Sequence, residues 1–290
     1  MCHRGKPLRP LSLGAGAAGR LDDGAMHPAA PVATLPRRRL ADDLRAAIDG
    51  GEVELRYQPQ VAMANGRITG VEVLARWRHP KLGELGAERL FAAVTRAGLG
   101  LALSRHIHAA ALTDAARWPA ALGELGIALN VTASDLAREA FGRDLLDVAA
   151  AAGIAPARIT VELTEHEPVT DLSQAADRLA TLRAAGVRVA LDDFGSGYAS
   201  VAWLRALPLD YLKLDGDLAA SLLGGERAQV VVRHVIAMAR ALGLAVIAEG
   251  VESEAHRMLL AAAGATHYQG FLCAPALDGP ALAVLVVSAA

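Results

Sequence analysis

Residues 187–214 read VRVALDDFGSGYASVAWLRALPLDYLKL, and their order of apolar and polar positions indicates how the chain folds. Apolar residues dominate a short run over 187–192, recur with helical spacing over 198–206, and dominate a second run over 211–214. Two short apolar strands separated by an amphipathic helix are typical of a parallel β/α unit. The stretch therefore predicts two parallel strands joined by a helix that covers them.

The same alternation extends outward from this stretch in both directions. About eight strands in about 250 residues fit an α/β fold of the (β/α)8 TIM barrel type. The alternative, a doubly wound open sheet, lacks the Gly-rich dinucleotide fingerprint after its first strand. Further strands are expected over 53–61, 68–77, 127–131, 159–163, 245–248 and 267–271. Further helices are expected over 40–48, 87–97, 100–118, from after 131 to about 152, 171–185, 226–242 and 253–263.

Composition argues against several classes of protein. Hydrophobic residues make up 53% and aromatic residues 4% of the chain, so the core is expected to consist mainly of Ala, Val, Leu and Ile. A net charge of −2 argues against binding to a DNA or RNA polymer, which favours a basic face. Cys2 and Cys273 lack metal-spaced partners, and no apolar run reaches the roughly 18–20 residues of a membrane span. We therefore expect a cytoplasmic protein.

The two ends of the chain differ in pattern. Residues 1–36 are rich in Gly, Ala and Pro and show no periodicity, which predicts a disordered leader or linker. The periodic pattern begins near residue 38, so the barrel domain is expected over 37–290. The final apolar stretch, 281–290, is too short to span a membrane and is predicted to form a closing helix packed on the core.

Polar residues recur where the expected strands end. In a parallel barrel these ends meet at one mouth, so carboxylates far apart in the sequence would gather in one pocket. Clustered like charges disfavour their ionised forms, and a divalent metal resolves that conflict. Carboxylate and amide oxygens suit Mg²⁺ or Mn²⁺ better than zinc. The residues are Asn130, Glu162, Asp192, Asp193, Lys213, Glu249 and Gln269, together with Glu72 inside the second strand.

Any one of these residues alone has a plainer explanation. An acid at a strand end more often caps the next helix, and Asp171 and Ser253 are expected to be ordinary caps. Capping does not explain Glu72, Lys213 or Gln269, so the pattern as a whole favours a functional site. Five histidines lack metal-ligand spacing beyond one i, i+2 pair and are interpreted mostly as surface residues or as supports behind the site: His79, His106, His108, His166 and His267.

Nine short segments carry a family resemblance. In chain order they are YQP (57–59), EVL (72–74), RW (76–77), LNVT (129–132), ELTE (162–165), DDFGSGY (192–198), KLD (213–215), EGVE (249–252) and QGF (269–271). Over about residues 40–280 the chain resembles EAL-domain cyclic-di-GMP phosphodiesterases. The DDFG and EGVE segments together are highly specific, whereas a lone Glu-x-Leu would carry no information.

The resemblance implies a modified (β/α)8 barrel whose first strand runs antiparallel. It also implies hydrolysis of cyclic di-(3′,5′)-GMP to linear pGpG, with Mg²⁺ or Mn²⁺ in a two-metal site. A homodimer is expected, with the loop 194–200 as a candidate edge of its contact. No sensor domain is visible in the sequence, so regulation is expected from a partner chain or from a fusion that has been lost.

The resemblance also implies a role for individual residues, carried over by position. Glu72, Asn130, Glu162 and Asp192 would hold one metal, and Asp192 and Asp193 would contribute to a second. Lys213 and Glu249 would act on the attacking water or on the second metal. Gln58, Arg76 and Gln269 would position substrate or solvent, and Glu165 would steady the loop 194–200.

The chain departs from the family pattern at four positions. Val73 replaces the Ala of the name motif, but it points away from Glu72 on a strand, so the ligand is expected to remain in place. Ala87 and Thr95 replace a Pro and a Glu in the following helix, and Ser196 replaces a Thr while keeping the hydroxyl.

Two other functions stay open at this point. The first is a degenerate EAL domain that binds cyclic-di-GMP or a protein without hydrolysis; such domains usually lack a metal ligand, and here each expected ligand is present. The second is a Schiff-base aldolase that uses Lys213, against which the surrounding acids and Asn130 argue.

Overall fold

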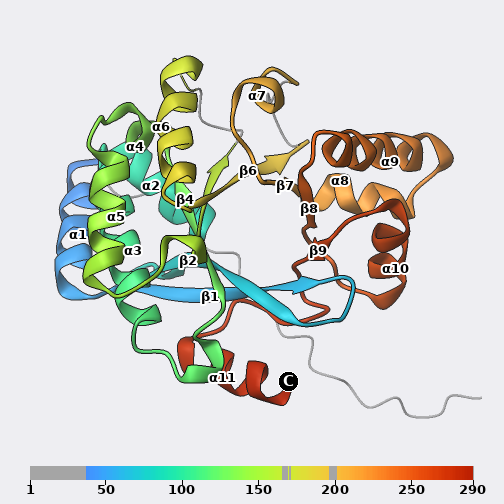
Figure 1. Cartoon of the computed structure of the whole chain (residues 1–290). Helices are drawn as coiled ribbons and strands as arrows, with labels where there is room; N and C mark the ends of the chain where they lie inside the picture. Colours follow the sequence, from blue (N-terminus) through green and yellow to red (C-terminus); the bar gives the residue numbers. More distant parts are fainter. Residues whose placement is uncertain (1–36, 165–168, 170, 196–200, 290) are drawn as a thin grey trace, which may run out of the picture. The chain divides into compact units, whose positions relative to one another are not determined.

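Apolar strands form one nine-stranded sheet, and eight of them close into a barrel (Figure 1). The computed structural model describes residues 37–164, 169, 171–195 and 201–289. The strands are β1 Val53–Ala62, β2 Ile68–His79, β3 Gly83–Leu85, β4 Gly126–Val131, β5 Ile159–Thr164, β6 Arg188–Phe194, β7 Tyr211–Leu214, β8 Ala245–Ala248 and β9 His267–Tyr268. Their order is β1-β9-β8-β7-β6-β5-β4-β2-β3; pairing of β1 with β2 closes the ring, and β3 stays outside it.

The first strand is reversed relative to the rest of the ring. β1 pairs antiparallel with β2 and with β9, whereas the pairs from β2–β4 round to β8–β9 are parallel. The register sets Gln58 opposite Glu72 and Val53 opposite Trp77, near the carboxyl end of β2. These pairings confirm the expected α/β barrel with an antiparallel first strand.

Helices cover the outside of the barrel and bury apolar stripes against it (Figure 1). On α3, for example, Leu103 and Ile107 are buried one turn apart, each contributing about 1.5–3 kcal/mol by leaving water. The helices are α1 Arg37–Gly50, α2 Ala87–Ala97, α3 Gly100–Ala115, α4 Ala133–Ala137, α5 Phe141–Ala151, α6 Leu172–Ala184, α7 Val201–Ala206, α8 Gly216–Ala220, α9 Glu226–Ala241, α10 Glu254–Ala263 and α11 Gly279–Ser288.

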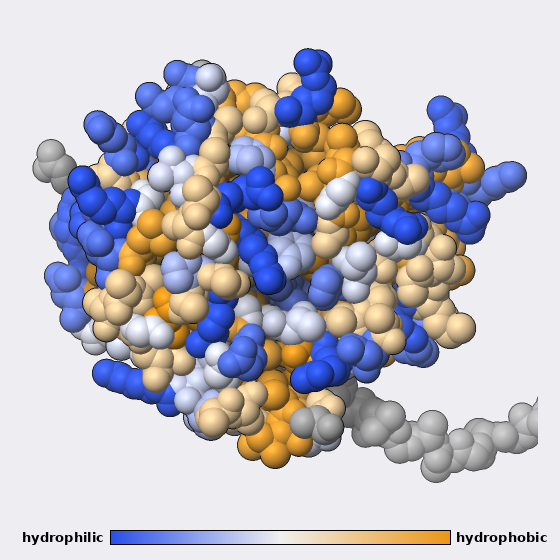
Figure 2. All heavy atoms as spheres, viewed as in Figure 1, coloured by the Kyte–Doolittle hydropathy of each residue, from blue (hydrophilic) through white to orange (hydrophobic). Residues whose placement is uncertain are grey.

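Two helix caps and the closing helix follow the sequence. The side chains of Asp171 and Ser253 accept hydrogen bonds from the backbone N–H groups of Gln174 and His256, which confirms both predicted caps. α11 packs Leu282 into the core as expected. Its remaining surface stays apolar: Figure 2 shows a hydrophobic patch at the lower edge of this face, where Figure 1 places α11. Among the described helices, none is long and apolar enough to cross a membrane.

Some expected boundaries are wrong for local reasons. The helix expected to reach about 152 is divided, because Arg138 adopts an extended conformation after α4 and α5 begins only at Phe141. The strand expected over 267–271 ends at Tyr268, because Gly270 turns the chain with φ 153°. A Cβ atom there would lie 2.4 Å from the backbone N of Val251, so only glycine fits. The short elements β3 and α8 were not predicted.

Other expectations concern residues that the structure does not describe. The predicted leader or linker over 1–36 lies outside the described residues, so the division of the chain at residue 37 stays a prediction. The helix expected over 198–206 is described from Val201 onward.

Candidate active site

Lys213 lies buried near the end of β7, and its ammonium group is shared by four carboxylates. Its Nζ atom lies 2.8 Å from Asp192 Oδ1, 2.9 Å from Glu249 Oε1, 3.0 Å from Glu162 Oε2 and 3.1 Å from Glu72 Oε2. Glu72, Glu162 and Asp192 come from β2, β5 and β6, and Glu249 directly follows β8. Segments far apart in the sequence therefore converge at the mouth of the barrel, as the strand-end pattern predicts.

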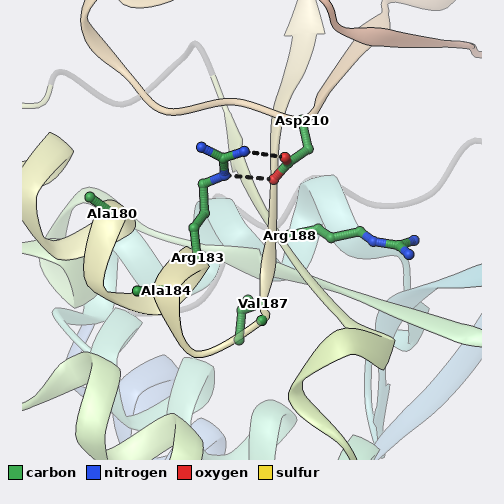
Figure 3. Close-up of a pocket in the computed structure, with 7 residues that line it drawn as sticks. Ala180, Arg183, Ala184, Val187, Arg188 and Asp210 are labelled. Carbon is green, nitrogen blue, oxygen red and sulfur yellow. Dashed lines mark hydrogen bonds and ion pairs between the residues drawn. The ribbon is translucent and has the colours of Figure 1, made fainter.

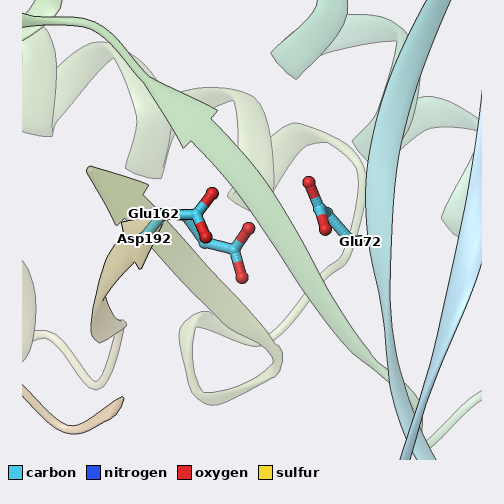
Figure 4. Close-up of side chains that lie close together, drawn as sticks. All are labelled: Glu72, Glu162 and Asp192. Atoms are coloured by element: carbon cyan, nitrogen blue, oxygen red, sulfur yellow. The ribbon is translucent and has the colours of Figure 1, made fainter. Parts of the chain in front are cut away.

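The carboxylates form two overlapping groups, each close enough to share a cation. One oxygen from each of Glu72, Glu162 and Asp192 lies within 4.8 Å of the others, and the same holds for Asp192, Asp193 and Glu249. Figure 4 shows the first three side chains pointing into the space between β2 on one side and β5 and β6 on the other. Asn130 joins this group from β4, donating a hydrogen bond from Nδ2 to Glu72 Oε1 at 3.2 Å.

Asp192 and Asp193 are consecutive, so on a regular strand their side chains would point to opposite faces. The pairing of β6 with β7 shifts register between Leu191 and Phe194, and Asp193 has φ 55°. Among the described residues it is the one non-glycine residue with positive φ. This conformation costs about 1–2 kcal/mol, and aspartate tolerates it better than most residues. The irregularity allows both carboxylates to reach the same cluster.

The cluster carries more negative charge than one lysine balances. Burial lowers the pKa of Lys213, but the four carboxylates outweigh it and hold that pKa well above its usual range. Burial, with repulsion from neighbouring acids, raises the pKa of Glu249 to about 8, that of Asp192 to about 6 and that of Glu162 well above its usual range. Burial also acts on Glu72, but Lys213 and hydrogen bonds from two amides leave its pKa lowered. The site therefore favours a further cation.

Three glutamines connect the carboxylates to β1 and β9. Gln269 Nε2 donates to Glu72 Oε2 at 2.5 Å and lies 3.4 Å from Gln58 Oε1. Gln60 Nε2 lies 3.3 Å from Gln269 Oε1 and 3.5 Å from Glu162 Oε1. Gln58 and Gln269 were expected at the site, whereas Gln60 was not. Its signal was its position two residues beyond Gln58, which places both side chains on the same face of the strand.

The remaining expected residues divide into those placed and those not described. Arg76 lies four residues beyond Glu72 on the same face of β2. Within the described part of the chain, its guanidinium donates to the backbone O of Ala75 at 2.9 Å and to none of the cluster carboxylates. Val73 is buried in the core, so its extra methyl groups pack as expected. Glu165 and Ser196 lie outside the described residues.

The described histidines are more buried than the sequence analysis expected for most of them. His79 and His108 are buried, and His106 and His267 are half-buried, whereas His166 lies outside the described residues. His108 on α3 is a support behind the site, since its Nε2 lies 2.9 Å from the backbone O of Asn130. The sequence held a signal for it, because a histidine on an otherwise apolar helix face requires a buried hydrogen-bond partner.

A separate cavity of about 450 Å³ lies at the opposite end of the barrel, where β6 and β7 begin. Figure 3 shows Arg183 and Asp210 joined across it by two hydrogen bonds, of 3.1 and 2.6 Å, while Arg188 points away from the pair. Asp210 Oδ2 also accepts a hydrogen bond from the backbone N–H of Val189 at 2.9 Å. In barrels this end serves stability rather than catalysis, and the pair fixes the start of β6 accordingly.

Comparison of the sequence with curated proteins identifies relatives of this chain. Two curated relatives from Pseudomonas aeruginosa are similar to the chain. Cyclic di-GMP phosphodiesterase PA2567 is 36% identical over 218 residues, which are 75% of this chain and 37% of the relative. Cyclic di-GMP phosphodiesterase RocR is 34% identical over 244 residues, or 84% and 61% of the two chains. The chain spans about a third of the length of the first curated relatives it matches.

Solved structures and a family model extend the comparison. The PaMucR phosphodiesterase in complex with c-di-GMP superposes with a TM-score of 0.78 and 30% identity, covering 84% of this chain and 99% of that one. The EAL enzyme Bd1971, with cAMP and cyclic-di-GMP bound, gives a TM-score of 0.81 and 26% identity over 86% and 69% of the two chains. The model of the EAL domain matches residues 41–276. The chain therefore belongs to the EAL domain family.

Proposed function

We propose that this domain is a metal-dependent phosphodiesterase that hydrolyses cyclic-di-GMP to linear pGpG in the cytoplasm. The observation that carries the proposal is the buried cluster around Lys213, in which four carboxylates meet at the carboxyl ends of barrel strands. The similarity to relatives named cyclic di-GMP phosphodiesterases and to a phosphodiesterase solved with c-di-GMP supports the choice of substrate.

The chemistry of the donors fits divalent cations. Every donor is an oxygen from a carboxylate or an amide, and the carboxylates exceed the single positive charge of Lys213. Such a set suits Mg²⁺ or Mn²⁺. Glu72, Asn130, Glu162 and Asp192 would hold one ion, and Asp192 and Asp193 would contribute to a second. When bound, the ions would supply Lewis acidity toward the phosphodiester and lower the pKa of the attacking water.

The protein's own groups supply the remaining chemistry in this proposal. Glu249 accepts the proton of the attacking water, because its carboxylate lies within 4.8 Å of those of Asp192 and Asp193, the expected ligands of the second metal. Lys213 adds positive charge where negative charge develops on the phosphoryl group. Gln58, Gln269 and Arg76 orient the substrate.

Two further parts of the proposal concern the loop after β6 and the assembly. Glu165 restrains the loop 194–200, which carries the residues directly after Asp193. The same loop forms an edge of a homodimer contact, and a partner chain or a fused domain supplies the regulatory input. Light scattering of the purified chain measures whether it forms the homodimer. A monomer at every concentration tested would contradict the homodimer.

The test is incubation of the purified chain with cyclic-di-GMP and Mg²⁺, followed by chromatography and mass spectrometry of the products. We expect pGpG as the product and no turnover after removal of divalent ions with a chelator. Tight binding of cyclic-di-GMP without conversion would instead identify a degenerate binding domain. Turnover that persists in the chelator would contradict the metal dependence.

A further inference from the structure

Helix α3 approaches the carboxyl end of β4 from the side facing away from the metal site. Ser104 and His108 lie one helical turn apart on α3, and both are buried. The His108 Nε2 atom lies 2.9 Å from the backbone O of Asn130. A carbonyl oxygen can only accept a hydrogen bond, so this contact requires Nε2 to carry the hydrogen and to donate it.

A second contact from the same helix holds the chain just beyond Asn130. Ser104 Oγ donates to Asp135 Oδ2 at 2.6 Å. The same oxygen accepts from the backbone N of Thr132 at 3.0 Å and from its Oγ1 at 2.7 Å. Asp135 is fully buried, and its N–H donates to Thr132 Oγ1 at 3.1 Å. Ser104 thus reaches the residue at 132 through Asp135, while His108 reaches the residue at 130 directly.

The two contacts fix the backbone on both sides of Val131. Asn130 projects its side chain from this segment toward Glu72, whose Oε1 lies 3.2 Å from Asn130 Nδ2. A rotation of the peptide at this point would move the Asn130 amide relative to the carboxylates of the cluster. Hydrogen bonds behind a metal ligand commonly alter metal affinity by about 10–100-fold, because they hold the ligand in its binding geometry.

We propose that His108 is a positioning residue that holds Asn130 in place as a metal ligand through its backbone carbonyl. The inference rests on the proposed function, which assigns Asn130 to the metal. His108 touches neither substrate nor metal in this role. It acts on the affinity of the site for the cation, with Ser104 and Asp135 as the second arm of the same support.

The alternative is that His108 only satisfies a buried carbonyl, and the chain contains a matched control for that case. His256 on α10 is also buried, and its Nε2 lies 2.9 Å from the backbone O of Ala219. The two histidines therefore make the same kind of hydrogen bond at the same distance. Only His108 makes it to a residue whose side chain joins the cluster of carboxylates.

The experiment compares three variants of the full chain: His108→Leu, His108→Gln and His256→Leu. Isothermal titration with Mg²⁺ gives the Kd in the absence of substrate, and thermal melting with and without Mg²⁺ gives a second readout. We expect His108→Leu to raise the Mg²⁺ Kd about 10-fold or more. We expect His108→Gln to recover most of that loss, since its amide can still donate. We expect His256→Leu to lower Tm while leaving the Kd unchanged.

The outcomes separate this inference from the proposed function. If the unmodified chain hydrolyses cyclic-di-GMP with Mg²⁺ and His108→Leu binds Mg²⁺ with the same Kd, the inference alone is overturned. An equal loss of affinity in His256→Leu also overturns it, since destabilisation would then explain both. If the unmodified chain neither binds Mg²⁺ nor turns over substrate, the proposed function and this inference are both overturned.

A second variant covers the case in which His108→Leu does not fold. Ser104→Ala removes a small hydroxyl from the same support and leaves His108 in place. We expect it to raise the Mg²⁺ Kd by about 2- to 10-fold, less than the loss of the direct contact. An unchanged Kd in a folded Ser104→Ala variant, with no folded His108→Leu to set against it, would overturn the inference.

Discussion

The two ends of the barrel use charge in different ways. At the mouth, one buried lysine is shared by four carboxylates, and three of those acids have raised pKa values. At the opposite end, Arg183 has Asp210 as its one ion-pair partner among the described residues, through two hydrogen bonds on a partly exposed surface. The Arg183–Asp210 pair is balanced in charge and holds the start of β6 in place. The four carboxylates around Lys213, here called the upper cluster, exceed its single positive charge, so the stability of this cluster depends on a further cation or on retained protons.

The largest effect is expected from Glu72→Ala at the mouth. Loss of one carboxylate ligand should release the metal and lower turnover by at least about 10³-fold, because a bound ion supplies several kcal/mol of transition-state stabilisation. The helices would still bury their apolar faces, so the fold should remain. A product assay and circular dichroism measure the two quantities. Retained hydrolysis would show that the EVL segment is not the metal site.

Lys213→Ala tests the balance of the upper cluster directly. Removing the shared cation leaves three buried carboxylates and the half-buried Glu249 facing one another, which should destabilise the metal-free protein by about 3–5 kcal/mol. Turnover should also fall by about 10²–10³-fold, as after loss of a preorganised donor. Urea unfolding with and without Mg²⁺ is the measurement, and we expect Mg²⁺ to restore part of the stability. Equal stability in both proteins without metal would contradict the shared role of this lysine.

Replacing Mg²⁺ by Ca²⁺ tests how closely the geometry of the carboxylate cluster fits the size of the bound ion. Ca²⁺ prefers longer bonds and more ligands than Mg²⁺, so it should bind without placing the attacking water correctly. We expect turnover in Ca²⁺ to be at least about 10-fold lower than in Mg²⁺ or Mn²⁺. Comparable rates in Ca²⁺ and Mg²⁺, measured at saturating concentrations of each ion, would rule out this explanation.

The pH dependence of the metal-free protein follows from the raised pKa values of Glu249 and Asp192, about 8 and about 6. A raised pKa in the folded state means that folding retains a proton, so its stabilisation is present at low pH and is lost as pH rises through the folded pKa. Stability should therefore fall from about pH 5 to about pH 8. The lowered pKa of Glu72 acts only below that range. Melting curves with a chelator present measure this slope, and a rise in Tm over the window would reverse the argument.

The smallest effect is expected from Arg183→Ala at the opposite end. The pair with Asp210 is partly exposed, so its loss should cost about 0.5–1 kcal/mol of unfolding free energy. Turnover and the Mg²⁺ requirement should not change, because no residue of the upper cluster contacts this pair. Urea unfolding together with a Mg²⁺ titration of turnover measures both. A changed Mg²⁺ requirement would mean that the two ends are coupled.

The sequence predicted the charged residues at the mouth of the barrel better than the residues and backbone geometry that hold them in place. Glu162, Asp192 and Lys213 could be found because parallel strands all end on the same side, so their last polar residues must meet. Gln60 was missed because it lies within the reversed strand β1, opposite Gly70, and not at the end of a parallel strand. The φ of Asp193 could not be read from the sequence, since an Asp-Asp pair on a regular strand would split its side chains between two faces.

The elements that were missed are short. β3 has three residues and α8 has five, too few for either period to show against chance. Ser104 and His108 belong to a helix that was predicted correctly, yet their partners on β4 and α4 could not be named without the packing of α3. Local periodicity therefore predicts which elements form, whereas hydrogen bonds between elements require the folded geometry.

The reversal of β1 has a consequence for the path of the chain from α1 to the candidate active site. In an all-parallel barrel, the chain enters at the end remote from the chemistry. Here Val53 pairs with Trp77 near the carboxyl end of β2, so α1 delivers the chain to the rim of the mouth. Five residues further on, Gln58 lies opposite Glu72 in the same ladder. A single strand, β1, therefore leads from the residues just after α1 to the partner of Glu72 in the cluster.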